Sequence, residues 1–259
     1  MQIPEESCYL CESMDKFGLI GHPLAGSGSP ALFEKAYGGR WRYDLIEGAD
    51  FELSWQKFLS EYQAINITAP FKELAFRKLM ENGVLGGPGS ADTSEEAIRA
   101  IGAVNIAVKE DDGLVHGYNS DYLGVLQILR KYGFGPDSTV VVAGFGGAGK
   151  AAAAASRALG CDTIVCNRTR HTPDIRPLDE LPILASVADL LVYTLAFPVP
   201  ELGLETEETA MPLPPAILEA NYRTPCLSGL QGYIPGTEWL AAQAETGYPL
   251  MTGCPPLQF

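Results

Sequence analysis

The chain has 259 residues, 46% of them hydrophobic and 19% charged, a composition typical of a globular protein long enough for two modest domains. Its formal net charge is −14 and its sequence pI is near 4.6, so a nucleic-acid backbone and an anionic membrane surface would both be repelled. No stretch approaches the roughly 18 uninterrupted apolar residues of a membrane span, and the acidic first residues are unlike a signal peptide. We therefore expect a cytoplasmic protein with no nucleic-acid or membrane partner.

Cysteine and histidine usage gives no indication of a metal centre. The six cysteines are scattered, which is typical of reduced thiols in a reducing compartment. Cys8 and Cys11 form the one suggestive pair, but no second pair stands at zinc-site spacing, and the three histidines have no ligand spacing. We predict no metal site, and we expect residues 1–13 to be either a flexible extension or the artefact of an upstream start.

The first half of the chain alternates short apolar runs with amphipathic stretches, as in a parallel or mixed sheet covered by helices. The predicted strands span residues 17–20, 43–46 and 64–68. The predicted helices start at Pro30, at Phe51, at Pro70 and near Ser94. Residues 103–108 and 114–118 flank an Asp-Gly turn and predict a β-hairpin, after which the first domain is expected to end.

In the second half, a helix over residues 120–132 is the natural bridge between domains. The β-branched run 138–143 predicts a buried strand, which is followed by a glycine-rich turn, an alanine-rich helix and a short strand at 163–166. Prolines leave room for only a short helix before the apolar run 190–195, and they make residues 198–215 a predicted loop. The last predicted elements are the segment 216–222 and an amphipathic helix near 237–245.

The glycine-rich turn Gly144-Phe-Gly146-Gly147-Ala148-Gly149 stands between a predicted strand and a predicted helix. In that context glycines let the backbone turn tightly and approach a pyrophosphate, whose charge is met by the first N–H groups of the helix. Glycine-rich turns also arise for close packing alone. The flanking strand and helix favour the interpretation as a dinucleotide site.

The residues about 20 positions after these glycines indicate which dinucleotide is bound. An NAD-binding chain places a carboxylate there for the ribose 2′-hydroxyl, whereas this chain has Asn167-Arg168-Thr169-Arg170. A guanidinium can bind a 2′-phosphate through two hydrogen bonds and can stack on adenine. We therefore predict NADP(H), bound in this acidic chain by Arg168 with help from Arg170, Lys150 and the helix start.

Three polar segments each suit a structural role as well as a chemical one. Lys72 lies in the first turn of a predicted helix, where the helix dipole disfavours a cation, so it is either a solvated lysine near Glu73 or is placed there for chemistry. Asp121 suits the dipole of its own helix, which by itself indicates a structural role. Ser27 and Ser29 lie in a Gly-Ser loop, where Ser29 can cap a helix and both hydroxyls can bind a polar ligand.

Taken in order, the segments resemble the shikimate dehydrogenase family from about Phe17 to Gly253. The matching motifs are Ser27-Gly28-Ser29-Pro30, the Asn-x-Thr-x-Pro-x-Lys segment 66–72, Gly102-Ala103-Val104-Asn105, Asn119-Ser120-Asp121, the glycine turn with Asn167-Arg168-Thr169, and the segment 236–243. The resemblance implies an α/β protein with an N-terminal α/β substrate domain, a Rossmann-type NADP-binding domain and an active site in the cleft between them. It places residues 14–119 with 236–259 in the substrate-binding catalytic domain and residues 120–235 in the NADP-binding domain.

The resemblance also implies roles for individual residues. Lys72 and Asp121 would be the catalytic pair. The substrate would be bound by Ser27, Ser29, Asn66, Thr68, Asn105, Tyr222 and Gln243. The cofactor would be bound by Gly144, Gly146, Gly147, Ala148, Gly149, Asn167, Arg168, Thr169 and Thr194. The implied activity is the reversible NADP(H)-dependent reduction of 3-dehydroshikimate to shikimate in the chorismate pathway of aromatic amino-acid biosynthesis, by a monomer or a homodimer.

Several positions depart from the family's usual pattern. Gly26 replaces a common histidine, Ile106 and Ser120 replace threonines, Asn221-Tyr222 lacks the usual preceding aspartate pattern, and Val192-Tyr193-Thr194 lacks the common asparagine before the threonine. These changes concern the substrate preference and the nicotinamide pocket, and they leave the lysine and the aspartate in place. Two alternatives therefore stay open: a quinate or aminoshikimate dehydrogenase, and a non-catalytic ligand or nucleotide sensor on the same fold.

Overall fold

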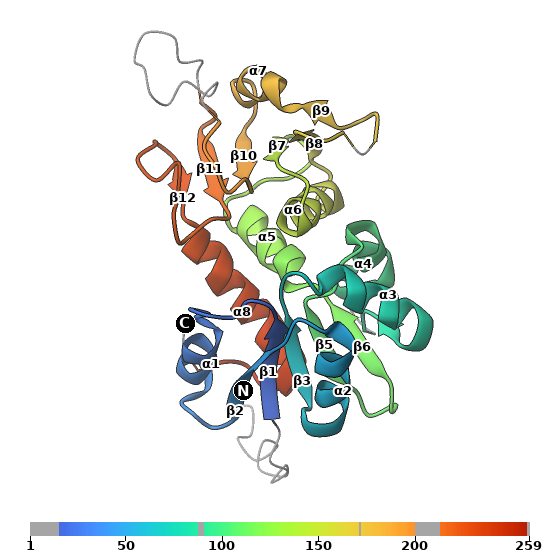
Figure 1. Cartoon of the computed structure of the whole chain (residues 1–259). Helices are drawn as coiled ribbons and strands as arrows, with labels where there is room; N and C mark the ends of the chain where they lie inside the picture. The colour runs from blue at the N-terminus through green and yellow to red at the C-terminus, as the bar shows by residue number, and fades with distance from the viewer. Residues whose placement is uncertain (1–15, 88–90, 171, 200–212, 258–259) are drawn as a thin grey trace, which may run out of the picture. The chain divides into compact units, whose positions relative to one another are not determined.

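The computed structural model describes residues 16–87, 91–170, 172–199 and 213–257 (Figure 1). These residues divide into two compact units. The first comprises residues up to 98 with 102–119 and those from 244 onward, and the second comprises residues 99–101 with 120–243. Each unit has its own six-stranded sheet, which confirms the predicted α/β class.

The first unit contains a mixed sheet with the strand order β2-β1-β3-β5-β6-β4. Its strands are β1 (Lys16–Gly21), β2 (Arg42–Glu47), β3 (Ala64–Ile67), β4 (Val84–Leu85), β5 (Ile106–Lys109) and β6 (Val115–Tyr118). β1 runs parallel to β2 and β3, whereas β5 is antiparallel to both β3 and β6. The predicted hairpin is therefore confirmed as β5–β6.

The helices of the first unit begin close to their predicted starts. They are α1 (Ser29–Tyr37), α2 (Phe51–Glu61), α3 (Lys72–Asn82), the short η2 (Ala91–Thr93), α4 (Glu95–Ile101) and the second half of α8 (Gly236–Thr252). The Asp50 carboxylate caps α2 by accepting from the Leu53 N–H at 3.0 Å. α3 starts two residues later than predicted, because a turn in which the Phe71 N–H donates to the Thr68 carbonyl at 2.9 Å precedes it.

Side chains on the central strand β3 alternate between two cores, one on each face of the sheet. Ile65 and Ile67 belong to the core beneath α2 and α3. Ala64 belongs to the opposite core, to which α1 and α8 contribute. Asn66 therefore shares the face of Ala64 and lies at the carboxyl end of β3, on the side of α1.

The second unit contains a parallel sheet with the strand order β12-β11-β10-β7-β8-β9. Its strands are β7 (Thr139–Ala143), β8 (Asp162–Asn167), β9 (Arg176–Pro177), β10 (Leu190–Tyr193), β11 (Ala216–Glu219) and β12 (Tyr233–Ile234). Its helices are α5 (Ser120–Lys131), α6 (Gly147–Ala158), η3 (Leu178–Glu180), α7 (Leu181–Ala185) and the first half of α8. This order, in which the chain starts in the middle and proceeds toward each edge in turn, is that of a doubly wound dinucleotide-binding sheet.

Two element ends differ from the sequence prediction. α8 continues beyond residue 245 and through Pro249, because Tyr248 and Met251 are buried in the core beside α1, and this packing outweighs the cost of a proline in a helix. β11 ends at Glu219, where the chain bends at Ala220, so it is shorter than the predicted segment 216–222. Residues 1–13, with Cys8 and Cys11, and most of the predicted loop 198–215 lie outside the described residues.

Within the described ranges, no helix has the length and apolar character needed to cross a bilayer. The same residues contain no group of three or more histidine, cysteine, aspartate or glutamate side chains placed to hold a metal ion.

Candidate active site

Four predicted site residues surround the carboxyl end of β3 in the first unit. Asn66 lies in the strand, Thr68 follows it, Lys72 is the first residue of α3, and Asn105 immediately precedes β5. The last N–H of β3 donates to the Asn105 carbonyl at 2.8 Å, and the residue before Asn105 donates to the Lys72 carbonyl at 3.0 Å. These backbone hydrogen bonds bring the four residues to one edge of the sheet.

Lys72 lies in the first turn of its helix, a position at which a cation is unusual. It stands at the positive end of an 11-residue helix whose N-cap residue, Phe71, makes no side-chain capping bond. Phe71 is only 2% exposed, so the start of the helix is anchored in the core. The helix dipole disfavours an ammonium here by some tenths of a kcal/mol, which supports a functional reason for the lysine.

Of the serine pair, Ser27 lies in the loop after β1 and Ser29 is the first residue of α1. Ser27 Oγ donates to Ser29 Oγ at 3.2 Å, and the Ser29 N–H donates to Ser27 Oγ at 3.4 Å. The Ser29 side chain also lies beside the Tyr43 hydroxyl, which donates to Asn66 Oδ1 at 2.7 Å. A continuous line of hydroxyl groups therefore runs from Ser27 to Asn66.

Tyr43 is a site residue that sequence reasoning missed. Its strand, β2, is separated from β3 by β1, so only the strand order reveals that the phenol reaches across to Asn66. Burial raises the pKa of Tyr43 well above its ordinary value, and the hydroxyl stays a hydrogen-bond donor over the physiological range. Because Asn66 Oδ1 accepts from Tyr43, the amide nitrogen of Asn66 points away from Tyr43.

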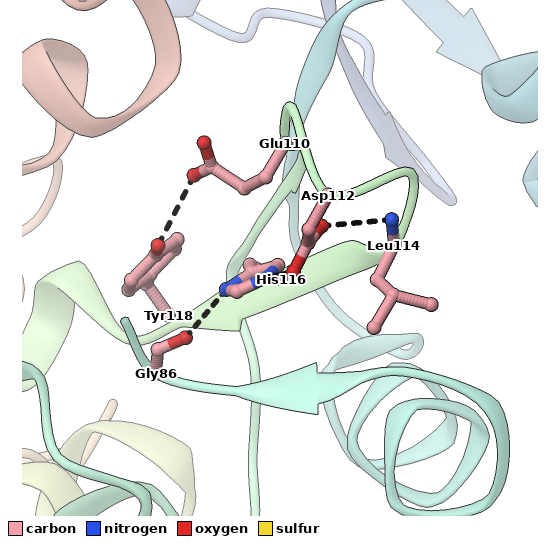
Figure 2. Close-up of polar contacts among 6 residues, drawn as sticks. All are labelled: Gly86, Glu110, Asp112, Leu114, His116 and Tyr118. Carbon is pink, nitrogen blue, oxygen red and sulfur yellow. Dashed lines mark hydrogen bonds and ion pairs between the residues drawn. The ribbon is translucent and has the colours of Figure 1, made fainter. Parts of the chain in front are cut away.

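A second polar network of the first unit lies on the β5–β6 hairpin and was not predicted (Figure 2). The buried His116 ring hydrogen-bonds to the Gly86 carbonyl through Nδ1 and to the Asp112 carboxylate through Nε2, both at 2.9 Å. Asp112 also accepts from the Leu114 N–H at 2.9 Å. The hydrogen bond from His116 holds the pKa of Asp112 below its ordinary value. This network fastens the segment after β4 to the hairpin.

In the second unit, the glycine-rich turn joins β7 to α6. Gly144 has a φ of +99°, which glycine adopts without strain, and a Cβ there would lie 2.5 Å from Thr194 Oγ1. A Cβ on Gly149 would lie 2.1 Å from the Gly144 carbonyl oxygen. A Cβ on Gly146, in contrast, would meet nothing within 4 Å. Packing therefore requires glycine at positions 144 and 149, while Gly146 borders open space.

The start of α6 completes this turn. The first three residues of this 12-residue helix are Gly147, Ala148 and Gly149, and its N-cap Gly146 provides no side-chain cap. Backbone N–H groups in this position form an anion site at the positive end of the helix dipole. Thr194, which follows β10, donates its hydroxyl proton to the Ala143 carbonyl at 2.8 Å and so helps to close the turn.

The residues predicted to recognise the 2′-phosphate follow β8. The Arg168 guanidinium lies over the Phe197 ring, 5.8 Å from its centroid. Asn167 Nδ2 donates to the Thr169 carbonyl at 2.8 Å and shapes this loop. The Arg170 guanidinium donates to two carbonyls of its own loop, at 2.9 and 3.3 Å. The recognition of a 2′-phosphate by Arg168 stays a prediction.

Asp121 and Gln243 lie on two helices of the second unit that pack against each other. Asp121 is the second residue of α5 and is buried, and its backbone carbonyl accepts from the Trp239 indole N–H at 3.1 Å. A Cβ on Gly124 of α5 would lie 3.0 Å from Gln243, so glycine is what allows this close approach to α8. Both predicted residues are therefore held on a rigid helix pair.

The loop that carries Tyr222 is fixed by a buried carboxylate that sequence reasoning also missed. Glu219, the last residue of β11, is fully buried. It accepts from the Cys226 N–H at 2.6 Å, the Leu227 N–H at 3.1 Å and the Tyr233 hydroxyl at 3.2 Å. An acidic residue at the end of an apolar run was the only sequence signal for this anchor. Tyr222 itself is 40% exposed on the loop.

A doubly wound parallel sheet with a glycine-rich turn after its central strand is typical of the dinucleotide-binding class of proteins. The chain is 32% identical over 216 residues to the shikimate dehydrogenase (NADP(+)) of Natronomonas pharaonis, a match that covers 77% of this chain and 74% of that protein. It is 30% identical over 255 residues to the shikimate dehydrogenase (NADP(+)) of Thermus thermophilus, covering 94% and 88%. The chain belongs to the shikimate dehydrogenase family, as its motifs predicted.

A solved structure agrees with this assignment. A shikimate 5-dehydrogenase of Thermus thermophilus, in complex with NADP(H) and shikimate, superposes with a TM-score of 0.73 at 27% sequence identity. The match covers 94% of this chain and 95% of that chain. No protein-family model matches the sequence.

Proposed function

We propose that this chain is an NADP(H)-dependent shikimate dehydrogenase, which reversibly reduces 3-dehydroshikimate to shikimate. The relatives of about 30% identity support the reaction. The observation that carries the proposal at residue level is the grouping of Lys72, Asn66, Thr68 and Asn105 at one sheet edge. We further propose that the reaction serves the chorismate pathway in the cytoplasm, which fits an acidic chain with scattered cysteines.

The chemistry needs a hydride donor and a proton donor. When bound, the cofactor supplies the hydride to the ketone carbon of the substrate. Lys72 would donate a proton to the developing alkoxide or stabilise its charge, and Asp121 is proposed as the second member of the catalytic pair. In the reverse direction the same pair would remove the proton of the substrate hydroxyl.

The hydroxyl and amide groups of the first unit suit a polyhydroxylated ring carboxylate. Ser27 and Ser29 would donate to the carboxylate, and Asn66, Thr68 and Asn105 would bind the ring hydroxyls. We also propose Tyr222 and Gln243 as substrate-binding residues, as the family resemblance implies. Because the Asn66 amide is already oriented by Tyr43, part of this site is fixed before the substrate binds.

The residues of the second unit suit NADP(H). The open space at Gly146 and the start of α6 would receive the pyrophosphate, with Gly144, Gly147, Ala148 and Gly149 shaping the turn and Thr194 closing it. Arg168 would bind the 2′-phosphate, within the loop formed by Asn167 and Thr169.

The test is a rate measurement on the purified protein. Shikimate and quinate are each offered with NADP⁺, and the reduced cofactor is followed by its absorbance. Turnover with shikimate supports the proposal, whereas turnover with quinate alone would identify a quinate dehydrogenase. Binding of either compound without turnover would instead point to a sensor that keeps the fold.

A further inference from the structure

We propose that Phe197 forms one wall of the adenine site and that Arg168 forms the other, so that the cofactor's base stacks between them. This inference rests on the proposed use of a nicotinamide dinucleotide, and it adds a residue that no motif of the family supplied. It concerns only the second unit.

The topology places both residues beside the glycine-rich turn. β7 lies between β8 and β10 in the parallel sheet, so the loops that follow these three strands emerge at the same edge. Arg168 is the first residue after β8, and Phe197 lies four residues beyond the end of β10. In doubly wound folds the ligand occupies the crevice outside the carboxyl ends of the strands.

Phe197 is an exposed ring on a fixed backbone. Its neighbours Leu195 and Val199 are buried in the core, whereas Phe197 itself is 40% exposed. The buried Tyr193 donates its hydroxyl to the Phe197 carbonyl at 2.6 Å. Pro198 follows and restricts the backbone of Phe197 further. An exposed aromatic ring on a backbone fixed in this way is suited to stack on a ligand.

The spacing of the two side chains fits a flat ring after a small movement. The Arg168 guanidinium carbon lies 5.8 Å from the centroid of Phe197. Since stacked carbon atoms sit about 3.5 Å apart, a base between two walls needs about 7 Å. Arg168 is exposed and has a long flexible side chain, so it can withdraw by the remaining ~1 Å without disturbing the core. Without a ligand, the guanidinium covers the phenyl ring.

Phe197 and Arg168 are expected to contribute to nucleotide affinity in ways that can be told apart. Phe197 contacts only the base in this arrangement, so its contribution is the same for any adenine nucleotide. Arg168 contacts the base and the 2′-phosphate, so its contribution is larger for the 2′-phosphorylated nucleotide. If Phe197 only held Arg168 in place, its loss would instead weaken recognition of the 2′-phosphate.

The experiment measures, by calorimetry, the Kd of adenosine 2′,5′-bisphosphate and of adenosine 5′-monophosphate for the whole protein. Phe197→Leu is expected to raise both Kd values by the same factor, at least about fivefold. Phe197→Tyr, which keeps the ring, is expected to stay within about twofold of the wild type. Arg168→Ala should raise the Kd of the bisphosphate more than that of the monophosphate.

A matched control is Ile183→Ala, which truncates an apolar side chain of the same unit that is 58% exposed, and which should change neither Kd. Unchanged binding in Phe197→Leu, or a loss confined to the bisphosphate, overturns the inference. If the wild type binds both nucleotides equally, the preference for NADP(H) fails, while the response of Phe197→Leu still decides the role of the ring. A wild type that binds neither nucleotide refutes both proposals.

Discussion

At the scale of single residues, Lys72 is the side chain on which the proposed chemistry depends. Its backbone is fixed by the hydrogen bond from the N–H of Val104, and its side chain is not part of either core. Lys72→Ala should therefore lower kcat by at least about 10²-fold with little change in the thermal unfolding midpoint.

Lys78→Ala is the matched control for Lys72→Ala, because Lys78 lies on the same helix but pairs with Glu52 at 2.5 Å. Its kcat should remain near that of the wild type. A Lys72→Ala enzyme that keeps its kcat within a few-fold would remove Lys72 from the mechanism.

Tyr43 tests whether the line of hydroxyl groups positions the substrate. Tyr43→Phe removes the donor to Asn66 Oδ1 while keeping the ring packed against its core. We expect KM for shikimate to rise several-fold, with kcat and KM for NADP⁺ little changed.

Tyr62→Phe provides the comparison for Tyr43→Phe, since Tyr62 donates to Asp44 at 3.0 Å and is not part of the candidate site. Equal KM values for shikimate in the wild type and in Tyr43→Phe would show that this hydroxyl does not order the site.

At the scale of elements, two glycines of the β7–α6 turn allow the effect of packing on stability to be distinguished from the effect on cofactor binding. Gly149→Ala forces a Cβ to within 2.1 Å of a backbone carbonyl, so it should lower the unfolding midpoint and weaken NADP⁺ binding together. Gly146→Ala adds a methyl group to open space, on a backbone that alanine can adopt. It should keep the midpoint and still raise the Kd of NADP⁺ by about tenfold or more.

The informative comparison is between Kd and the unfolding midpoint in the two glycine variants. If Gly146→Ala binds NADP⁺ as the wild type does, the pyrophosphate does not approach this part of the turn, and the interpretation of the open space is wrong.

The β5–β6 hairpin makes stability depend on pH through Asp112. Its pKa is lowered first by the hydrogen bond from His116 and next by the Leu114 N–H, so its contribution to stability is present above its ordinary pKa and is lost as pH falls through the lowered value. In urea unfolding, Asp112→Asn should be less stable than the wild type at about pH 6, and the difference should shrink toward about pH 2.

Asp111→Asn, a change to the neighbouring residue of the same turn, should show a much smaller difference from the wild type at about pH 6. A difference between Asp112→Asn and the wild type that stays constant across this pH range would contradict the assignment.

At the scale of the whole molecule, sequence patterns predicted the elements whose signal lies within one short segment of the chain. The order strand, glycine turn, helix, strand, arginine predicted the second unit from β7 to Arg168, and the Asp-Gly turn predicted the β5–β6 hairpin. The two-residue strands β4, β9 and β12 carry no periodicity and were missed. The length of α8 depends on the burial of Tyr248 and Met251 in a distant core, which no local window contains.

The residues of the candidate site likewise divide into those predicted from a short motif and those found only in the structure. The motifs supplied Lys72, the serine pair and the glycine turn, because each belongs to one short segment. Tyr43 and Phe197 came only from the structure, because each role depends on the strand order of a sheet, in which one strand stands between the two that carry the partners.

The most direct test of the central claim compares the two cofactors on one substrate. Purified wild-type protein is assayed for shikimate oxidation with NADP⁺ and with NAD⁺, and the values of kcat/KM are compared. We predict turnover with shikimate and a preference for NADP⁺ of at least about tenfold, which Arg168→Ala should largely remove by raising KM for NADP⁺. Absence of turnover with shikimate would contradict the proposed activity, and equal use of NAD⁺ would contradict the role of Arg168.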